Sequence, residues 1–426
     1  PRFTAWCYWG RHVGNSTQYY RAGIRALSSD LGNPLDGVRI LELGQIIAGT
    51  YGSQVLTDLG AEVIKIEPPK GDLGRNPSVA PYKGMSGLFL TFNRNKKSVV
   101  IDLKTDEGRE LFYDLVKTAD VVIDNFRSGV LKRLKVDYES LSKVNPRIIQ
   151  CTVTGFGTEG AYKNFPAWDI IVQAMSGHMS ITGENDGPPV RLGVPFGDLS
   201  GGIFSCKAIL AALFDRERNG KGRCIELSMF DAMLNLLTYI GTMYLSNGEV
   251  PERMGSAHEY TVPWGAFAAK DGFVVLAVRE EISWQNLCKV MDAPDLVDDE
   301  RFATNIDRTK NGKILIPLIR EIFEKRTVDD WIKNLRAADV PASPLLDLEG
   351  AFAEPPVAER NMIVEYDHPE VGKVRLPGNP IKMTGLAEVI SNPAPLLGEH
   401  TDEVLGGLLN LSPDRLKELH DKGVIK

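Results

Sequence analysis

The carboxylate of Asp198 is the side chain in this sequence best suited to covalent chemistry. It lies in the segment Gly197-Asp198-Leu199-Ser200-Gly201-Gly202, at the start of an apolar stretch that predicts a helix. An aspartate there commonly caps the helix by accepting hydrogen bonds from backbone N–H groups. A cap does not need the pair Gly201-Gly202, which is costly inside a helix and indicates that a bulky group approaches the backbone closely. Asp198 is therefore a candidate nucleophile, with the backbone of Gly201 and Gly202 as candidate oxyanion donors.

Two clusters of basic residues follow predicted strands and are candidates for holding phosphates. The first lies in residues 93–98 (Asn-Arg-Asn-Lys-Lys-Ser), with Lys104 beyond the next strand. The second follows the strand that ends at residue 124 and comprises Arg127, Lys132 and Arg133. A basic run alone is more often a solvated turn, but ligands of open α/β sheets bind beyond the carboxyl ends of the strands. On charge alone, Lys96 and Lys97 are predicted to contact a phosphate-bearing ligand.

Other chemical signatures are weak or missing. Gly155-Phe156-Gly157-Thr158-Glu159-Gly160 fits the G-x-G-x-x-G pattern, but Asn164-Phe165-Pro166 continues as a loop where a dinucleotide fingerprint would open a helix, so a strand-end turn is favoured. The six histidines form no pair at i, i+4 spacing and the five cysteines form no C-x-x-C pair, so no metal site is predicted. The sequence also lacks a P-loop and a G-x-S-x-G motif, which argues against nucleotide-driven and serine-hydrolase chemistry.

The elements that must position these residues alternate between strand and helix. Apolar runs predict strands at residues 38–43, 62–67, 98–103, 120–124, 148–154 and 224–227. Helical patterns are expected at residues 54–59, 107–118, 199–214 and 229–245, with a Gly-spaced turn at residues 44–52. A strand pair around the turn Lys270-Asp271-Gly272 and charged helices indicate a smaller domain, and an amphipathic helix is expected near residues 413–422. The pattern predicts an α/β fold with a mostly parallel, doubly wound sheet.

Composition excludes several protein classes. The 426 residues are enough for two or three domains, and 43% hydrophobic with 25% charged residues is typical of a globular chain. The 49 basic and 56 acidic residues give a net charge of −7, which argues against a nucleic-acid or anionic-membrane partner. No uninterrupted run of 18 apolar residues predicts a membrane span. An odd number of scattered cysteines is typical of a reducing compartment.

The first 29 residues differ from the rest of the chain. They contain Arg2, Arg11, Arg21 and Arg25 and no acidic residue. This composition resembles an organellar transit peptide, and an upstream extension is the alternative. We expect a cytoplasmic location if the segment is an extension and a mitochondrial location if it is a transit peptide.

Several motifs together resemble the class III CoA-transferases, the family of the formyl-CoA and carnitine CoA-transferases. The resemblance extends from about residue 34 to the C-terminus. It rests on residues 34–43, 59–69 with Gly71-Asp72, 93–98, 124–126, 183–189 and 395–401.

The resemblance implies a fold, an assembly and an activity. It implies a Rossmann-like large domain with a smaller α+β domain, in a dimer of interlocked chains, either a homodimer or a heteromer with a related chain. The expected boundaries are an extension at 1–33, a CoA-binding domain at 34–228, linker helices and a small domain at 229–348, and a segment returning to the large domain at 349–426. The implied activity is CoA transfer, EC 2.8.3 type, from an acyl-CoA to a carboxylic acid, with coenzyme A as substrate and no metal or redox cofactor.

The family's nucleophilic aspartate corresponds to Asp198. By this resemblance its carboxylate attacks the donor thioester to give a mixed anhydride, and the released thiolate then forms an aspartyl-CoA thioester. An aspartate with its usual pKa would already be ionised at neutral pH. The positions that correspond to family contacts with CoA are Ile46, Ile47, Ala48, Ile101, Lys104, Asn125, Phe126 and Arg133.

Departures from the family pattern bear on the acid substrate. Formate- and oxalate-using members have Gln and Arg where this chain has Ile47 and Pro68, which puts such small acids in doubt. Residues 253–260 replace a Gly-rich loop and look like the loop of members that use succinyl-CoA and dicarboxylic acids. The predicted acid-pocket residues are Trp168, Arg253, His258 and Tyr260, with Arg253 and His258 as partners for a distal carboxylate.

Two alternatives remain open. The α-methylacyl-CoA racemases share the fold, but they have His before the aspartate that matches Asp169, and this chain has Trp168, which supplies no titrating group. Asp169 is then a second active-site carboxylate or a buried structural one. The other alternative is a non-catalytic subunit of a heteromeric CoA-transferase, which the presence of Asp198 disfavours.

Overall fold

The computed structural model describes residues 31–387 and 392–426, so the predicted transit peptide or extension at residues 1–29 lies outside the described residues. The chain divides into two compact units, which are described separately. The first unit comprises the described residues up to Asp169, Phe196–Ala232 and Val357–Lys426. The second comprises Ile170–Pro195 and Met233–Pro356. The predicted large domain at 34–228 differs from this division, because residues 170–195 group with the second unit.

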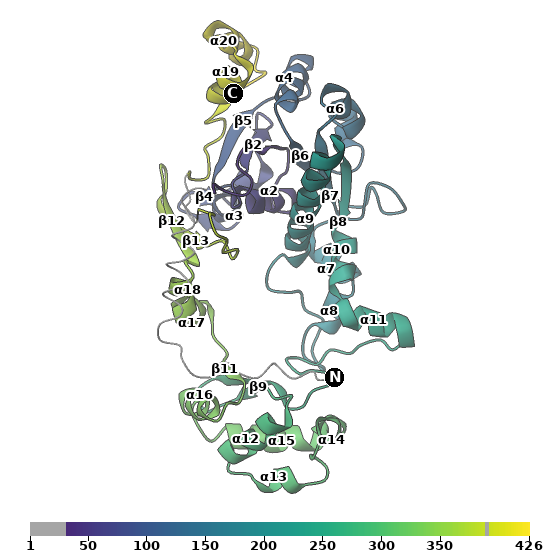
Figure 1. Cartoon of the computed structure of the whole chain (residues 1–426), viewed down its shortest axis with the longest axis vertical. Coiled ribbons are helices and arrows are strands. Elements are labelled where there is room, and N and C mark those ends of the chain that lie inside the picture. The colour runs from purple at the N-terminus through teal and green to yellow at the C-terminus, as the bar shows by residue number, and fades with distance from the viewer. Residues whose placement is uncertain (1–30, 388–391) are drawn as a thin grey trace. The chain divides into compact units, whose positions relative to one another are not determined.

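The first unit is built on a six-stranded sheet in the order β5-β2-β1-β6-β7-β8, in which every neighbouring pair is parallel (Figure 1). The strands are β1 (Arg39–Glu42), β2 (Glu62–Glu67), β5 (Lys96–Val100), β6 (Val121–Asp124), β7 (Ile149–Thr154) and β8 (Cys224–Ser228). Chain order runs outward in both directions from β1, so the order reverses between β1 and β6. This arrangement confirms the predicted parallel, doubly wound sheet, and the point of reversal is where such sheets bind ligands.

Burial on both faces explains the sequence of the central strands. Val121, Val122 and Ile123 of β6 are fully buried, as expected for a parallel strand that helices cover on both sides. Helix α4 (Asp106–Lys117) follows the usual rules at its ends: the Thr105 hydroxyl accepts from the Gly108 N–H, and Lys117 lies in the last turn. It packs Leu111, Phe112 and Leu115 into the core, together with Leu405 and Leu419 from the C-terminal segment.

Helices α2 (Ala48–Thr57) and α9 (Phe196–Asn219) cross at close range. A Cβ added to Gly202 would lie 2.7 Å from Tyr51 Cδ1, and one added to Gly52 would collide with Ser205 Oγ. The Gly-spaced turn predicted at 44–52 is therefore wrong in its second half, because its glycines lie in α2 and permit this packing. Among the described residues, α9 is the one helix long and apolar enough to cross a membrane, but half of its apolar window is buried, and it packs against α2 and β7.

Shorter elements complete the first unit. The C-terminal segment returns to the sheet edge, where the Thr401 hydroxyl accepts from the Val100 N–H at 3.1 Å and Ile425 bridges to Ile101. The remaining elements are η1 (Leu73–Arg75), β3 (Pro81–Tyr82), β4 (Met85–Ser86), α3 (Gly87–Phe92), α5 (Val130–Leu134), α6 (Tyr138–Val144), β12 (Ile363–His368), β13 (Gly372–Pro377), α19 (Thr401–Leu409) and α20 (Pro413–Asp421).

The second unit has an antiparallel sheet in the order β11-β10-β9, packed around the buried Trp284 and Trp331. Strands β9 (Trp264–Ala268) and β10 (Phe273–Ala277) confirm the hairpin predicted at residues 270–272. Strand β11 is Ala342–Pro344. The helices of this unit, or at its boundaries, are α7 (Asp169–Met175), α8 (His178–Ile181), α10 (Met229–Leu236), α11 (Thr238–Asn247), α12 (Glu281–Val290), α13 (Asp295–Asp298), α14 (Asn305–Lys310), α15 (Gly312–Phe323), α16 (Val328–Ala337), α17 (Leu348–Ala353) and α18 (Pro355–Glu359).

Candidate active site

The candidate site lies at the reversal point of the sheet, where the loops after β1 and β6 meet. The loop after β1 carries Gln45, Ile46 and Ile47 to the start of α2, and the loop after β6 begins with Asn125 and Phe126. Two neighbouring cavities in the first unit share Gln45, Phe126 and Val130 in their walls. The two cavities therefore adjoin each other at these residues.

The first cavity, which we call the aspartate cavity, has a volume of about 310 Å³ and is lined by Asp198. Its wall brings together the predicted nucleophile and five of the predicted CoA contacts: Asp198, Ile46, Ile47, Ala48, Asn125 and Phe126. Trp168 of the predicted acid pocket also lines it. Trp168 is 61% exposed and remains available to a ligand.

The second cavity, which we call the basic cavity, has a volume of about 300 Å³ and lies between the ends of β2, β5 and β6. Lys104 and Arg133 line it together with the apolar Ile101 and Phe126. Lys104 comes from the first predicted basic cluster and Arg133 from the second. These two clusters therefore contribute one cation each to this cavity, whose wall also includes Glu67 and Asp102, while Arg127 of the second cluster lines the aspartate cavity.

Asp198 lies in the first turn of α9 and is partly buried. Burial raises the pKa of its carboxyl group, and the nearby charge of Asp169 raises it further, to about 7. Its position at the N-terminal end of a long helix acts in the opposite direction, because the helix dipole favours a negative charge there. The expectation of an ordinary aspartate pKa is thus wrong: ionised Asp198 is a stronger base than a solvated carboxylate, and it coexists with the protonated form near neutral pH.

Asp169 holds the start of the helix that carries Asp198. Its Oδ1 accepts a hydrogen bond from the Gly197 N–H at 2.7 Å. This contact satisfies one of the N–H groups that a helix N-terminus leaves without an intrahelical partner. Asp169 therefore combines a structural contact with an electrostatic effect on Asp198.

The predicted oxyanion role of Gly201 and Gly202 does not fit the structure. Because α9 begins at Phe196, the N–H groups of Gly201 and Gly202 donate to the carbonyls of Gly197 and Asp198 within the helix. Both glycines are buried, and their missing side chains make room for Val153, Met229 and Tyr51. The bulky group that approaches this backbone is another helix and the core, rather than a ligand.

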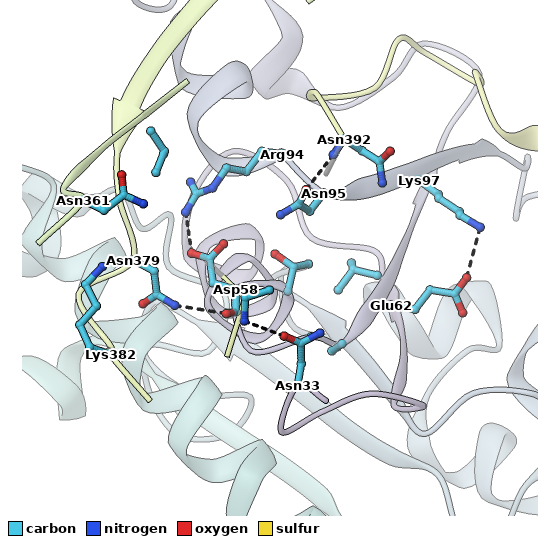
Figure 2. Close-up of a pocket in the computed structure, with 16 residues that line it drawn as sticks. Asn33, Asp58, Glu62, Arg94, Asn95, Lys97, Asn361, Asn379, Lys382 and Asn392 are labelled. Atoms are coloured by element: carbon cyan, nitrogen blue, oxygen red, sulfur yellow. Dashed lines mark hydrogen bonds and ion pairs between the residues drawn. The ribbon is translucent and has the colours of Figure 1, made fainter. Parts of the chain in front are cut away.

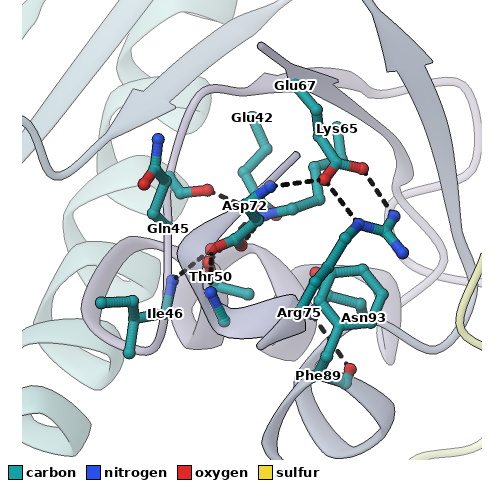
Figure 3. A network of polar contacts seen from close by, with 12 residues as sticks. Glu42, Gln45, Ile46, Thr50, Lys65, Glu67, Asp72, Arg75, Phe89 and Asn93 are labelled. Carbon is teal, nitrogen blue, oxygen red and sulfur yellow. Dashed lines mark hydrogen bonds and ion pairs between the residues drawn. The ribbon is translucent and has the colours of Figure 1, made fainter. Parts of the chain in front are cut away.

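The charge-based prediction for Lys96 is also wrong. Its side chain is fully buried, and its Nζ donates to Glu42 Oε2 at 2.6 Å, to the Thr50 carbonyl at 2.9 Å and to Ser53 Oγ at 2.9 Å. Its partner Glu42 belongs to a buried network of charges with Lys65 and Asp72 (Figure 3). Lys96 lines neither the aspartate cavity nor the basic cavity.

Lys97 lies on a third cavity of about 270 Å³, at the opposite, amino-terminal edge of β2 and β5 (Figure 2). Its Nζ pairs with Glu62 at 3.3 Å and with Glu403 at 3.0 Å. In the same cavity, Arg94 pairs with Asp58 at 2.5 Å. Lys97 is therefore not brought together with the predicted CoA contacts.

The remaining acid-pocket residues belong to the second unit. The Arg253 guanidinium donates to the Gly187 carbonyl at 2.9 Å and to the Glu184 carbonyl at 3.3 Å, so it fastens one loop of its own unit. The His258 Nδ1 accepts from the Tyr260 N–H at 3.1 Å, and the His258 ring lies 5.1 Å from that of Trp264. Arg253 therefore already makes structural contacts within the second unit.

The aspartate cavity has an aromatic wall that was not predicted from the sequence. Phe156, Tyr162 and Phe165 line it, and their ring centroids lie 5.7 to 5.9 Å apart. Phe156 lies in the G-x-G-x-x-G segment, which forms a strand-end loop fastened by Thr158 to Glu226. The position of this loop directly after β7 was the available signal, since neighbouring parallel strands end at the same edge of a sheet.

Comparisons with known proteins agree with this geometry. The sequence matches CoA-transferase family III over residues 35–401. It is 41% identical to an acetyl-CoA:oxalate CoA-transferase of Acetobacter aceti, over 86% of this chain and 93% of that protein. It is 34% identical to a human succinyl-CoA:glutarate CoA-transferase, over 95% of this chain and 94% of that protein. The crystal structure of a CAIB/BAIF family protein from Brucella suis is similar, with a TM-score of 0.80 and 37% identity, over 89% of this chain and all of that one.

Proposed function

The chain belongs to CoA-transferase family III and is a CoA-transferase of the EC 2.8.3 type, and from this premise we propose that it transfers CoA from succinyl-CoA to a dicarboxylic acid through Asp198. A relative named succinyl-CoA:glutarate CoA-transferase and one named succinate–glutarate CoA-transferase support the donor and the class of acceptor. A relative named for succinyl-CoA and mesaconate, 38% identical over 87% of this chain, supports the same class.

The observation that carries the proposal is the position of Asp198. Its carboxylate lines a cavity that adjoins a second cavity with Lys104 and Arg133. We place the nucleotide phosphates of CoA in the basic cavity and the pantetheine arm past Phe126 and Val130, which line both cavities. This path brings the thioester into the aspartate cavity, next to the nucleophile.

The proposed reaction exchanges one thioester for another without net uptake of water or protons. The Asp198 carboxylate attacks the succinyl-CoA carbonyl carbon, the C–S bond breaks, and CoA leaves as a thiolate, which leaves a mixed anhydride of succinate and Asp198. The thiolate attacks the Asp198 carbonyl carbon and releases succinate, which gives an aspartyl-CoA thioester. The acceptor carboxylate attacks this thioester and releases the thiolate, and the thiolate then attacks the acceptor's acyl carbon. The products are a new acyl-CoA and free Asp198.

The aromatic wall suits this chemistry because an anhydride must be protected from hydrolysis. Phe156, Tyr162 and Phe165 offer apolar surface beside Asp198, which limits access of water once the cavity is filled. Oxyanion stabilisation must then come from groups other than Gly201 and Gly202. The candidates are N–H groups in the first turns of α2 and α9, where Ala48 and Asp198 line the cavity.

Mass spectrometry tests the covalent step directly. The purified protein is mixed with succinyl-CoA and treated with borohydride or hydroxylamine, and the adduct is mapped by peptide digestion. We expect a CoA-dependent modification of Asp198 in the wild type and in Asp106→Asn, and none in Asp198→Ala. Asp106 is a suitable control because it also lies in the first turn of a helix, α4, but is exposed. A modification on another residue, or an active Asp198→Ala protein, would contradict the proposal.

An acceptor panel tests the acid. Ile47 and Pro68 argue against oxalate, whereas the relative from Acetobacter aceti is named for acetyl-CoA and oxalate. The panel therefore contains glutarate, mesaconate and oxalate with either donor. We expect the highest kcat/KM with succinyl-CoA and a longer dicarboxylic acid, and a preference for acetyl-CoA with oxalate would overturn this assignment.

The assembly is also part of the proposal. We propose a dimer of two interlocked copies of this chain. Light scattering on the purified protein measures the mass, and a monomer, or activity that requires a second, different chain, would contradict the homodimer.

A further inference from the structure

Three side chains hold the backbone of the loop between β1 and α2, and none of the predicted roles explains this arrangement. Lys65 Nζ donates to the Gly44 carbonyl at 2.8 Å. Asn125 Oδ1 accepts from the Gln45 N–H and Asn125 Nδ2 donates to the Gln45 carbonyl, both at 2.8 Å. Asp72 Oδ1 accepts from the Ile46 N–H at 3.0 Å (Figure 3). Four consecutive polar groups of the backbone are thus each bound by a side chain from another element.

The loop needs such support because its backbone is unusual. Ile46 has a φ of +65°, in the left-handed region that β-branched residues rarely adopt. A residue persists in such a conformation only when its surroundings fix it. No glycine relieves the strain at this position, so the side-chain contacts must hold the loop in place.

Asp72 connects the loop to a buried network of charges. Its Oδ1 also accepts from the Gly74 N–H at 2.7 Å, and its Oδ2 pairs with Lys65 Nζ at 2.7 Å. Lys65 in turn pairs with Glu42 at 2.6 Å, and the Asp72 N–H donates to Glu67. The side chains of Asp72, Lys65, Glu42 and Glu67 are all buried. The orientation of Asp72 is therefore fixed from several sides.

The loop forms part of both cavities. Gln45 lines the aspartate cavity and the basic cavity, and Ile46 lines the aspartate cavity. We propose that Lys65, Asp72 and Asn125 form a backbone clamp that holds the Gly44–Ile46 loop in the conformation that receives acyl-CoA, and that Asp72 is its central positioning residue. This inference rests on the proposed function for the identity of the ligand, but the clamp itself is a property of the free protein.

Hydrogen exchange on the free protein tests the clamp without any ligand. In the wild type, the amides of Gln45 and Ile46 are expected to exchange slowly. Asp72→Ala removes the acceptor of the Ile46 N–H, and Asn125→Ala removes that of the Gln45 N–H. We expect the peptide that covers residues 44–48 to exchange at least about tenfold faster in either variant, since each loses a hydrogen bond that holds the loop.

Kinetics with succinyl-CoA test the consequence. Loss of a hydrogen bond to a charged group corresponds to about a tenfold to hundredfold change, so KM for succinyl-CoA should rise by at least about tenfold in Asp72→Ala. The value of kcat should change less, because Asp198 lies on a different element. A merely structural role would lower the amount of folded enzyme without separating KM from kcat.

Asp120→Ala is the control for the loss of an ion pair. Asp120 precedes β6 at the opposite edge of the sheet, where it pairs with Arg216 at 2.8 Å and accepts from the Arg39 N–H at 2.8 Å. For Asp120→Ala, we expect the hydrogen exchange rate at residues 44–48 and the KM for succinyl-CoA to match those of the wild type. If Asp72→Ala does not fold, hydrogen exchange in Asn125→Ala decides, because this variant leaves no unpaired buried charge and exchange is measured without ligand.

The outcomes separate the two proposals. Unchanged exchange in both clamp variants, or the same change in Asp120→Ala, would overturn the clamp. Faster exchange with an unchanged KM would show that the loop is held but does not serve acyl-CoA, which also overturns the inference. A wild-type protein that binds no acyl-CoA would overturn the proposed function, and with it the role of the clamp.

Discussion

Glu42 is fully buried and Asp198 is partly buried in the first unit, yet the pKa values of their carboxyl groups shift in opposite directions. Burial and the charge of Asp169 raise the pKa of Asp198 to about 7. Burial acts in the same direction on Glu42, but Lys65 and Lys96 outweigh it and lower its pKa to about 2. Burial alone therefore does not decide the charge of a carboxyl group. Of these two carboxylates, Glu42 pairs with two lysines, whereas Asp198 lines the aspartate cavity and has no ion pair with a cation among the described residues.

Asp124 supports this comparison at the same edge of the sheet. It is fully buried and accepts hydrogen bonds from Thr152 Oγ1 at 2.8 Å and from the Phe126 N–H at 3.1 Å. Burial raises its pKa to about 7, because these neutral donors offset only part of the cost. A buried carboxyl group that has hydrogen bonds but no cation thus keeps a pKa near 7. Two neighbouring lysines instead keep Glu42 ionised.

The largest expected effect comes from removing the charge of Glu42, the buried carboxylate that pairs with two lysines. Glu42→Gln leaves Lys65 and Lys96 with one acidic partner fewer inside the core, which should lower the free energy of unfolding by about 3–5 kcal/mol at neutral pH. Urea unfolding followed by circular dichroism measures this change. Glu365→Gln removes an exposed carboxylate that pairs with Lys373, and it should leave the midpoint unchanged. Equal midpoints in the two variants would show that the buried network contributes no more than a surface pair.

The next effect concerns Asp198 and the pH dependence of activity. Only ionised Asp198 is a nucleophile, so kcat/KM should rise with pH through about 7 and reach a plateau above it, with about a hundredfold increase between pH 5 and pH 8. Initial rates with succinyl-CoA and glutarate over this range measure the profile. Because the pKa of Asp124 is raised similarly, Asp124→Asn is the control, and its midpoint should stay near that of the wild type. A flat pH profile would show that the ionisation of Asp198 does not limit the rate. Loss of the midpoint in Asp124→Asn would assign the titration to Asp124.

A smaller effect should be visible in stability. Because the pKa of Asp198 is raised in the folded state, ionisation there is unfavourable: the penalty is absent at about pH 3, grows as pH rises and is complete above about 7. Asp198→Asn removes it, so this variant should be more stable than the wild type by about 1–2 kcal/mol at pH 8 and equally stable at low pH. Thermal melts at both pH values measure the difference. A variant that is less stable at pH 8 would mean that ionised Asp198 has a stabilising partner.

The sequence predicted the strands of the sheet better than the locations and partners of the charged side chains. Continuous Val and Ile runs identified β6 and β7, because a strand covered on both faces carries no polar alternation. Lys96 was misjudged because a lysine next to a turn is usually solvated, and only the order β5-β2-β1 brings it to Glu42. A signal was present: Glu42 and Lys65 each interrupt an apolar strand, and charges inside such strands must be paired.

The role of the glycines was also beyond the sequence. Gly201 and Gly202 indicated a close approach to the backbone, which is what the structure has, but a pattern does not say whether a ligand or a helix approaches. Asp198, which the sequence predicts as the nucleophile, lines the aspartate cavity, but its raised pKa was not foreseen. That pKa depends on Asp169, which lies 29 positions earlier in the chain and reaches the same helix end only in the folded unit.

The smallest expected effect separates the two influences on Asp198. Asp169→Asn removes the like charge but keeps an oxygen that can accept from the Gly197 N–H, so the first turn of α9 should stay in place. The pKa of Asp198 should then fall, and kcat/KM at about pH 6 should rise about threefold relative to its plateau value. Asp169→Ala also loses the acceptor, and it should lower the plateau itself. If the two variants instead shift the profile equally and share one plateau, the carboxylate of Asp169 acts through its charge alone, and burial must account for the rest of the shift.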